Sequence, residues 1–273
     1  MKHEVIIMAA PNGARKTKVD HATLPVSIAE TVAEAADCRA AGAAALHAHV
    51  RGDQEEHVLD AGRYRELLDE LARQVPDMLV QVTSEAVGVY TPQQQIECIQ
   101  TVRPEMVSMA LKEISSNFSD EDSARRFFDW CDEASVHVQH IVFSAEELSH
   151  FLDYRERGIV PSQHRCVLFV LGRYRADFQS TPSDLGPFLE QDLSGLDWFV
   201  CAFGHQEQDC VMTAIEAGGH GRIGFENNLY LPDGSLAGST AGLIASLGQR
   251  IEASGYRAAS PGSARSLLGL RSA

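Results

Sequence analysis

The sequence predicts an α/β fold, a single (β/α)8 (TIM) barrel, because three observations agree. Short runs rich in apolar and β-branched residues alternate with helical patterns from one end of the chain to the other. Eight strand-like runs are present, and most lack a clean polar alternation, as expected for parallel strands covered on both faces. The chain has 273 residues, 44% of them apolar, which suits the length and the core of one such barrel.

No low-complexity linker and no shift in composition marks a second domain, so we expect residues 1–273 to form one domain. The expected strands cover residues 4–10, 45–50, 78–83, 106–111, 137–143, 165–171, 197–203 and 222–226. The expected helices cover residues 27–41, 61–74, a segment opened by Thr91 and Pro92, then 119–134, 144–157, 181–192, 206–217 and 240–254. A short C-terminal helix over residues 260–270 is expected to pack on the barrel exterior.

Capping residues support these helices. Ser27 is a good N-cap, Glu30 three residues later completes a capping box, and Gly42 follows the end of the same helix. Thr91 followed by Pro92 is a second cap, since proline is favoured in the first helical turn.

The net charge of −15 argues against nucleic acid as a partner, because binding phosphates requires clustered Lys and Arg. It does not exclude an anionic substrate, provided that local basic residues override the overall field. The six cysteines form no C-x-x-C pair, and neither a signal-peptide pattern nor a membrane-length apolar run is present. We therefore expect a reduced, soluble, cytoplasmic protein that has no membrane partner.

The sharpest chemical signal is the pair His47 and His49 at the end of the second expected strand. Residues two apart on a strand face the same side, so both imidazoles can reach one cavity. Glu226 ends the last expected strand, which lies two places away from the second strand around a barrel. Two imidazoles and a carboxylate suit Zn²⁺ or another divalent metal. The alternatives are two hydrogen-bonded core histidines and a salt bridge from Glu226 to Arg222.

The loop after the first strand, residues 11–18, is cationic and lies where an anionic substrate would enter. Asn12 and Arg15 are candidates for substrate binding, since a guanidinium can clamp a carboxylate with two hydrogen bonds. We expect Lys16 and Lys18 to be solvated.

Hydroxyl groups near two other strand ends can hold a carboxylate or a carbonyl oxygen. Thr83 and Ser84 follow the third strand, and Ser108 lies within the fourth. The alternative is that they cap the next helix. We expect His140 to be a satisfied core histidine, and His57 and His164 to lie at the surface. His205 and Gln206 are expected at the edge of the site, and Glu85 and Glu113 are expected to have no direct role.

Four stretches of the sequence together resemble a known family. They are AAPNGA, AGAAALHAHVR, RPEMVSMAL and GGHGRIGFENN, and the likeness extends from the first strand to the terminal helix. They resemble the β-keto acid cleavage enzymes, which include the 3-keto-5-aminohexanoate cleavage enzymes. The resemblance implies a zinc-dependent (β/α)8 barrel, usually a homotetramer. It also implies condensation of a β-keto acid with acetyl-CoA as co-substrate, by a retro-Claisen type route that gives acetoacetate and a new acyl-CoA.

The resemblance also implies roles for individual residues. The family's metal ligands match His47, His49 and Glu226, and its arginine before the metal glutamate matches Arg222, which would favour the reactive anion. The family's hydroxyl residues, expected to hold the substrate carboxylate and carbonyl, match Thr83, Ser84 and Ser108. Arg222, Asn227 and Ser84 are thus the candidate catalytic residues.

Two positions depart from the family pattern. Members with a defined general base have aspartate directly after the metal glutamate, whereas this chain has Asn227, and an amide takes up no proton at neutral pH. Arg15 replaces an acidic residue of the enzymes that act on amino substrates, which favours a substrate with a neutral or anionic far end. Asn227 keeps a zinc lyase or hydrolase open as an alternative, and a non-catalytic metabolite-binding barrel is the third reading.

Overall fold

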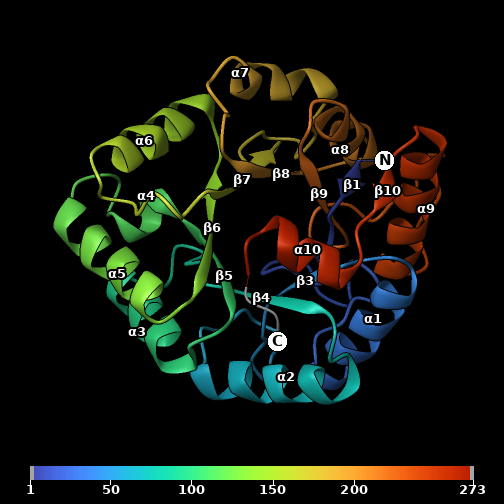
Figure 1. Ribbon diagram of the computed structural model, residues 1–273. Coiled ribbons are helices and arrows are strands. Elements are labelled where there is room, and N and C mark those ends of the chain that lie inside the picture. Colours follow the sequence, from blue (N-terminus) through green and yellow to red (C-terminus); the bar gives the residue numbers. More distant parts are fainter. Residues whose placement is uncertain (1–2, 271–273) are drawn as a thin grey trace.

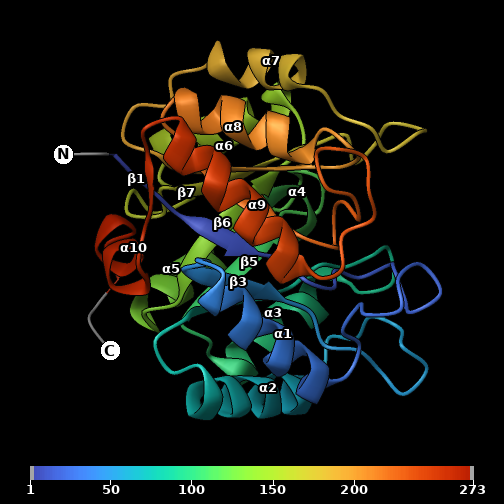
Figure 2. The same ribbon diagram turned by 90° about the vertical axis from the view of Figure 1, so that its right-hand side faces the viewer.

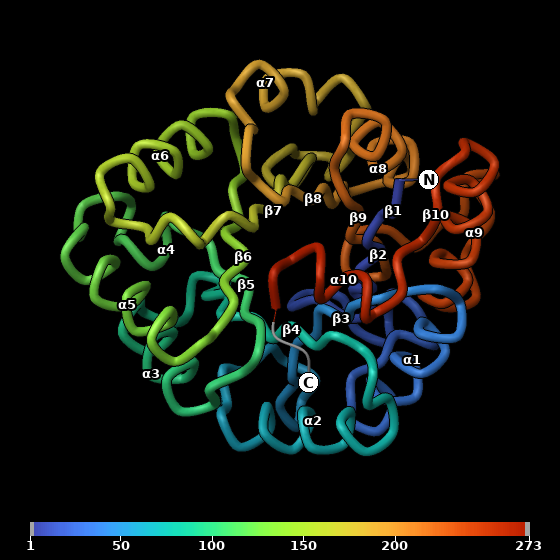
Figure 3. Tube along the Cα trace, viewed as in Figure 1, coloured from blue at the N-terminus to red at the C-terminus, as the bar shows by residue number. Residues whose placement is uncertain are grey.

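In the computed structural model, which describes residues 3–270, eight parallel strands close into a barrel enclosed by helices (Figure 1). The strands follow one another around the barrel in chain order, as the colours in Figure 3 show, so the predicted (β/α)8 fold is confirmed. The barrel strands are β2 (Ile7–Ala9), β3 (Ala45–Ala48), β4 (Leu79–Thr83), β5 (Met106–Ala110), β6 (His137–Val142), β7 (Cys166–Leu171), β8 (Asp197–Ala202) and β9 (His220–Ile223).

The helices lie between the strands, and side-chain caps begin most of them. Ser27 and Glu30 form the predicted capping box of α1, and Thr91 caps α3 with Pro92 in its first turn. The helices are α1 (Ile28–Ala40), α2 (Ala61–Gln74), α3 (Pro92–Val102), α4 (Leu111–Ile114), α5 (Glu121–Glu133), α6 (Ala145–Glu156), α7 (Gly186–Leu189), α8 (Glu207–Glu216), α9 (Thr240–Ala253) and α10 (Pro261–Leu267).

Two expected elements are divided in the structure. The helix expected over residues 181–192 is a 3₁₀ helix, η1 (Pro182–Leu185), followed by the single turn α7. Gly186 and Pro187 account for the break, since glycine is a weak helix former and proline has no N–H to donate. The strand expected over residues 4–10 is divided at Ile6, whose N–H donates to Nδ1 of His220.

The first half of that divided strand lies outside the barrel. It is β1 (Glu4–Val5), which pairs in parallel with β10 (Arg257–Ala258). The second half, β2, pairs with β3 on one side and β9 on the other. The metal-ligand candidates of the β3 and β9 segments are therefore separated by one strand only, as the sequence argument requires.

The C-terminal helix closes one end of the barrel rather than packing on its outer ring. α10 lies over the barrel centre in Figure 1, and Figure 2 shows it on the side opposite the long loops. Ala264 and Leu268 belong to the same buried cluster as the barrel residues Ile6, Met106 and Phe199. Since α10 covers the N-terminal ends of the strands, the C-terminal ends remain accessible.

Two further observations bear on the expected class of protein. Within residues 3–270, no helix is both long and apolar enough to cross a membrane. All six cysteines are buried and unpaired, as apolar filler in the core.

Candidate active site and metal centre

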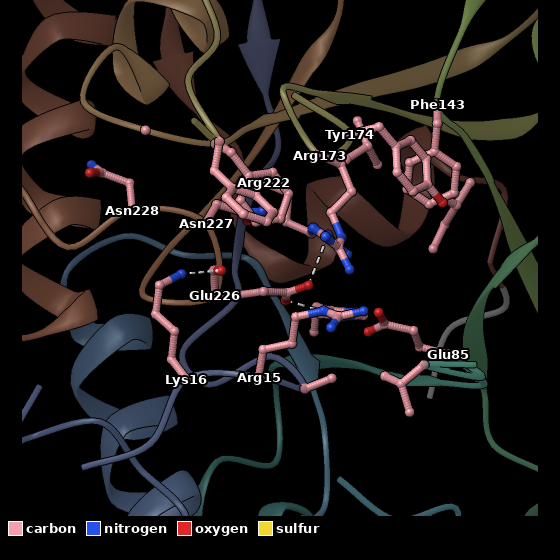
Figure 4. A pocket seen from close by; sticks show the side chains of 18 of the residues that line it. Arg15, Lys16, Glu85, Phe143, Arg173, Tyr174, Arg222, Glu226, Asn227 and Asn228 are labelled. Carbon is pink, nitrogen blue, oxygen red and sulfur yellow. Dashed lines mark hydrogen bonds and ion pairs between the residues drawn. The ribbon is translucent and has the colours of Figure 1, made fainter. Parts of the chain in front are cut away.

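A cavity of about 660 Å³ lies at the C-terminal ends of the barrel strands (Figure 4). Loops that follow all of the strands except β3 contribute to its wall. Part of the wall is apolar, with Ile141, Phe143, Val170 and Tyr174, and the rest is strongly charged. Catalytic groups of (β/α)8 barrels are found at this end, where the sequence argument places them.

The three predicted metal ligands meet at the cavity. Nε2 of His47 lies 3.0 Å from Nε2 of His49 and 3.3 Å from Oε2 of Glu226, and Nε2 of His49 lies 3.9 Å from Oε1 of Glu226. Ligand atoms at 2.0–2.1 Å from a tetrahedral zinc would be about 3.3 Å from one another. Within residues 3–270, these are the three side chains of suitable type that are close enough to share one ion.

The hydrogen bonds of His47 leave its Nε2 free to bind a cation. Nδ1 of His47 lies 2.9 Å from Oε1 of Gln81. The Gln81 amide is oriented by its Nε2, which donates to Oε1 of Gln139, and Gln139 in turn donates to Sγ of Cys166. Since Oε1 of Gln81 can only accept, the His47 proton is on Nδ1, and Nε2 presents a lone pair.

His49 has the same tautomer for a different reason. Its Nδ1 lies 3.3 Å from Nδ1 of His57, and Nε2 of His57 lies 2.8 Å from the backbone carbonyl of Glu85. The carbonyl requires a donor, so the His57 proton is on Nε2 and its Nδ1 accepts from His49. The lone pairs of two Nε2 atoms then face each other at 3.0 Å beside a carboxylate, an arrangement that fits a bound cation.

Burial keeps these imidazoles neutral, as metal ligation requires. His47 and His49 are each 1% exposed. Burial lowers the pKa of both side chains well below the usual value, and the positive charge of Arg222 lowers that of His47 further.

Glu226 lies in the turn after β9, not at the end of the strand as the sequence suggested. Its backbone N–H donates to the carbonyl of Ala10, and its carbonyl accepts from Nζ of Lys16 at 2.7 Å. Gly13 packs directly against its side chain: a Cβ added to Gly13 would lie 2.5 Å from Cγ of Glu226. The first loop therefore positions the carboxylate of the candidate metal site.

Arg222 and Asn227 are both buried at 3% exposure, and both line the cavity. Nη2 of Arg222 contacts Oε1 of Glu226 at 3.3 Å and Sγ of Cys201 at 3.4 Å. Its Nε and Nη1, and both amide atoms of Asn227, have no hydrogen-bond partner within the described chain. Unpaired polar atoms are costly in a protein interior, so these groups are suited to contact a bound molecule.

The predicted hydroxyl residues divide into two groups. Thr83 lines the cavity, and its Oγ1 accepts from the backbone N–H of Glu85. Ser84 and Ser108 are fully buried behind the wall: Ser84 donates to the Ser108 carbonyl at 3.4 Å, and Oγ of Ser108 lies 3.5 Å from Nδ1 of His47. Ser108 thus lies beside the candidate ligand His47, and Ser84 contacts the backbone of Ser108.

Asn12 also lies behind the metal site. Its Oδ1 accepts from the N–H of His49 and its Nδ2 donates to the carbonyl of the same residue. Arg51 links the neighbouring segments, since its guanidinium donates to the carbonyls of Asn12, Gly13 and Lys16. Both side chains hold the first loop against the end of β3.

The cavity mouth carries two guanidinium groups that have no hydrogen bond or ion pair within residues 3–270, those of Arg15 and Arg173. Their ends and that of Glu85 point into the same space near Glu226 (Figure 4). Burial, then the charge of Glu226, raises the pKa of Glu85 to about 7. The carboxyl groups that line the described cavity besides that of Glu226 belong to Asp20, Glu85 and Glu113.

The expectation that Lys16 is solvated was wrong. Lys16 is partly buried and lines the cavity, because it contacts the Glu226 turn, and burial lowers its pKa. Lys18 remains partly exposed to solvent and forms an ion pair with Glu30 at 2.8 Å. Glu85 and Glu113 both line the cavity. His205 also lines it, as expected, whereas Gln206 is exposed and does not line it.

The remaining histidine expectations also need correction. His57 and His164 are 8% and 5% exposed, so neither is a surface residue. His140 is in the core, but both its ring nitrogens lack a hydrogen-bond partner within the described chain, so it is not satisfied. Sequence reasoning missed Arg173, although its place two residues after β7 was a usable signal.

The fold and the site together define a (β/α)8 enzyme that has a candidate metal centre at the catalytic end of the barrel. The chain belongs to the β-keto acid cleavage enzyme family, whose sequence model matches residues 4–270. The family prediction from the sequence is thereby confirmed.

The sequences of known relatives align with this chain over nearly its whole length. It is 28% identical to the 3-keto-5-aminohexanoate cleavage enzyme of Fusobacterium nucleatum, over 99% of this chain and 100% of that protein. It is 25% identical to the 3-oxoadipate:acetyl-CoA acetyltransferase of Cupriavidus necator, over 100% of this chain and 97% of that protein. A solved structure described as the ternary complex of ObcA with C4-CoA adduct and oxalate superposes with a TM-score of 0.73 and 14% identity, over 91% of this chain and 68% of that one. The last likeness concerns the fold alone.

Proposed function

We propose that this protein cleaves a β-keto acid with acetyl-CoA as co-substrate, giving acetoacetate and a new acyl-CoA, with Zn²⁺ at His47, His49 and Glu226. In the net reaction, the carboxymethyl carbon of the keto acid exchanges its acyl group for the acetyl group of the thioester. The acyl group is transferred to the sulfur of CoA, so the reaction requires neither an oxidant nor a reductant. The curated relatives, which are named as keto acid cleavage enzymes and an acetyl-CoA acetyltransferase, support this reaction class.

The observation that carries the proposal is the meeting of two proton-free imidazole nitrogens and one carboxylate at the cavity. When bound there, a divalent ion supplies Lewis acidity that polarises a carbonyl oxygen and stabilises developing negative charge. The donor set of two imidazoles and a carboxylate also leaves a position open for a substrate atom.

Arg222 and Asn227 are the residues that we propose to act on the reacting groups. The Nε and Nη1 atoms of Arg222 are fixed and unpaired, so they can stabilise an enolate without reorganisation. Asn227 can donate to and accept from the substrate, but it cannot take up a proton. We propose that Ser108, whose backbone carbonyl accepts from Ser84, keeps the His47 ring in place, and that Thr83 contacts the substrate.

We further propose that the substrate carries a second anionic group at its far end. Within residues 3–270, Arg15 and Arg173 have no hydrogen bond or ion pair, although the Arg173 guanidinium lies over aromatic rings at the mouth. A guanidinium pairs well with a carboxylate. The relative named for 3-oxoadipate acts on a dicarboxylic keto acid, which is consistent with this view. If Arg15→Glu retains full activity on dicarboxylic β-keto acids, Arg15 has no part in this recognition.

The test is to incubate the zinc-loaded protein with acetyl-CoA and a panel of β-keto acids, and to identify acyl-CoA and acetoacetate by mass spectrometry. Both products should appear, and the near-isosteric Glu226→Gln variant should form neither. Consumption of the acid without acyl-CoA would instead indicate a lyase or hydrolase. Thermal stabilisation by one acid without turnover would indicate a metabolite-binding barrel. We also propose that the protein is a homotetramer, as the family resemblance implies, and light scattering would measure the mass of the assembly.

A further inference from the structure

His57 is a buried imidazole that directly follows the metal-ligand segment yet lies outside the proposed ligand set. Arg51 and His57 form an antiparallel bridge, which folds residues 51–57 back onto the end of β3. The His57 ring packs edge-on against His49, with ring centroids 5.0 Å apart, and against Tyr90 at 6.2 Å. These contacts fix the plane of the ring and aim its two nitrogens in opposite directions.

The backbone carbonyl of Glu85, which can only accept a hydrogen bond, determines which nitrogen of His57 is the donor. The backbone carbonyl of Glu85 has no proton to give, so Nε2 of His57 must donate to it, at 2.8 Å. A neutral imidazole carries one ring proton, which leaves Nδ1 of His57 as an acceptor. Nδ1 of His49 lies 3.3 Å away and must then be the donor. One carbonyl thus determines the tautomer of two rings in sequence.

No second acceptor for the His49 Nδ1 proton is present within residues 3–270. Its ring is 1% exposed, so bulk water does not compete for that position. His47 has a separate partner in Gln81, which means that the two ligands are oriented independently. Removing the His57 acceptor should therefore disturb His49 and leave His47 oriented.

We propose that His57 is a positioning residue for the metal centre: it holds His49 in the tautomer and orientation that present Nε2 to the ion. It also links His49 to the loop that carries Glu85, since the same ring donates to the Glu85 carbonyl. The proposal rests on the metal site of the proposed function. Outer-shell partners of metal-bound histidines contribute about 10- to 100-fold to metal affinity.

Three substitutions separate the two hydrogen bonds of His57. His57→Phe keeps a ring but removes both bonds. His57→Asn places an amide oxygen near the position of Nδ1, so it can still accept from His49. His57→Gln places an amide nitrogen near the position of Nε2, so it can donate to the Glu85 carbonyl but not accept from His49. His164→Phe is the matched control, because His164 is also buried, at 5% exposure, but has no contact with the metal ligands.

Zn²⁺ affinity is measured by competition with a chromophoric chelator, and the ligand field is read from the absorption bands of the Co²⁺-substituted protein. His57→Phe and His57→Gln should bind Zn²⁺ about 10- to 100-fold more weakly than wild type and change the Co²⁺ spectrum. His57→Asn and His164→Phe should stay within about threefold of wild type, with an unchanged spectrum. Thermal melts of the metal-free variants identify any that are unfolded.

The outcomes distinguish this inference from the proposed function. If wild type binds Zn²⁺ and His57→Phe binds it equally well, His57 has no positioning role, while the metal site stands. The same conclusion follows if His57→Asn is folded and binds as weakly as His57→Gln. If wild type binds neither Zn²⁺ nor Co²⁺, the metal site of the proposed function fails, and this inference fails with it.

Discussion

Replacing Gly13 by alanine tests whether the first loop positions the metal carboxylate. Gly13 has φ of 61°, in the left-handed region that favours glycine. A Cβ at this position would lie 2.5 Å from Cγ and 3.0 Å from Cβ of Glu226. Because atoms cannot approach so closely, either the loop or the Glu226 side chain must move. Both movements alter the distance from the carboxylate to His47 and His49.

The expected loss of stability has two parts. A left-handed conformation costs alanine about 1–2 kcal/mol, and overpacking of a filled site costs about 1–3 kcal/mol. Together they lower the free energy of unfolding by about 2–5 kcal/mol. An unfolding entropy of about 2.1 cal/mol/K per residue converts this into a decrease in Tm of about 4–9 °C.

Gly158→Ala is the matched control, since Gly158 has φ of 66° and the nearest atom to an added Cβ is Nη1 of Arg125 at 4.0 Å. The control should show only the conformational cost, a decrease in Tm of about 2–4 °C, with unchanged Zn²⁺ affinity. Melts of the metal-free proteins and chelator competition measure both quantities. If Gly13→Ala matches the control in Tm and in Zn²⁺ affinity, the reasoning about the first loop is wrong.

Three further predictions follow from the same structure. Burial lowers the pKa of His137 and of His164 to about 4. The contribution of these two neutral rings to the free energy of unfolding is therefore fully present above pH 6.5 and is lost as the pH falls from 6.5 to 4. At pH 5 each ring costs about 2 kcal/mol, and denaturant titrations at pH 7 and pH 5 should show that His164→Phe loses about 2 kcal/mol less than wild type. Arg222→Lys should lower kcat about 100-fold in steady-state assays, because one compact ammonium cannot replace the fixed guanidinium; unchanged kcat would exclude the proposed role. Arg173→Met should raise KM about 10- to 100-fold for a dicarboxylic β-keto acid but not for a monocarboxylic one; equal effects on both would exclude recognition of a far carboxylate.

Much of the fold could be predicted from the sequence because the signals for it are local. Capping residues such as Ser27 and Thr91 define helix starts within a few residues, and apolar runs define buried strands. The division of the first strand could not be predicted. It depends on pairing of β1 with β10 and on a hydrogen bond from Ile6 to His220, both of which join residues more than 200 positions apart.

The candidate metal ligands could be predicted because barrel geometry brings the C-terminal ends of the strands, and the turns that follow them, to one end of the barrel. His47, His49 and Glu226 needed only that rule and the chemistry of their side chains. The supporting residues follow no such rule. In the sequence, His57 cannot be distinguished from a polar loop residue, because its position depends on the bridge that it forms with Arg51. The role of Lys16 depends on its contact with a turn 210 residues later in the chain.

The charges of the site explain how a protein of net charge −15 can be suited to an anionic substrate. Burial lowers the pKa of both candidate-ligand imidazoles and keeps them neutral, and Arg222 contacts the carboxylate of Glu226, the third candidate ligand, at 3.3 Å. With a divalent ion bound, the ion, the candidate ligands and Arg222 would together carry net positive charge at the cavity floor, and the guanidinium groups of Arg15 and Arg173 extend this field to the mouth. A keto acid would then be attracted locally, because nearby charges in a low-dielectric cavity outweigh distant, solvent-screened surface charges. The same positive field lowers the energy of the enolate, which carries one more negative charge, more than that of the keto form from which it arises. This difference is the condition for accelerating the reaction rather than merely binding the substrate.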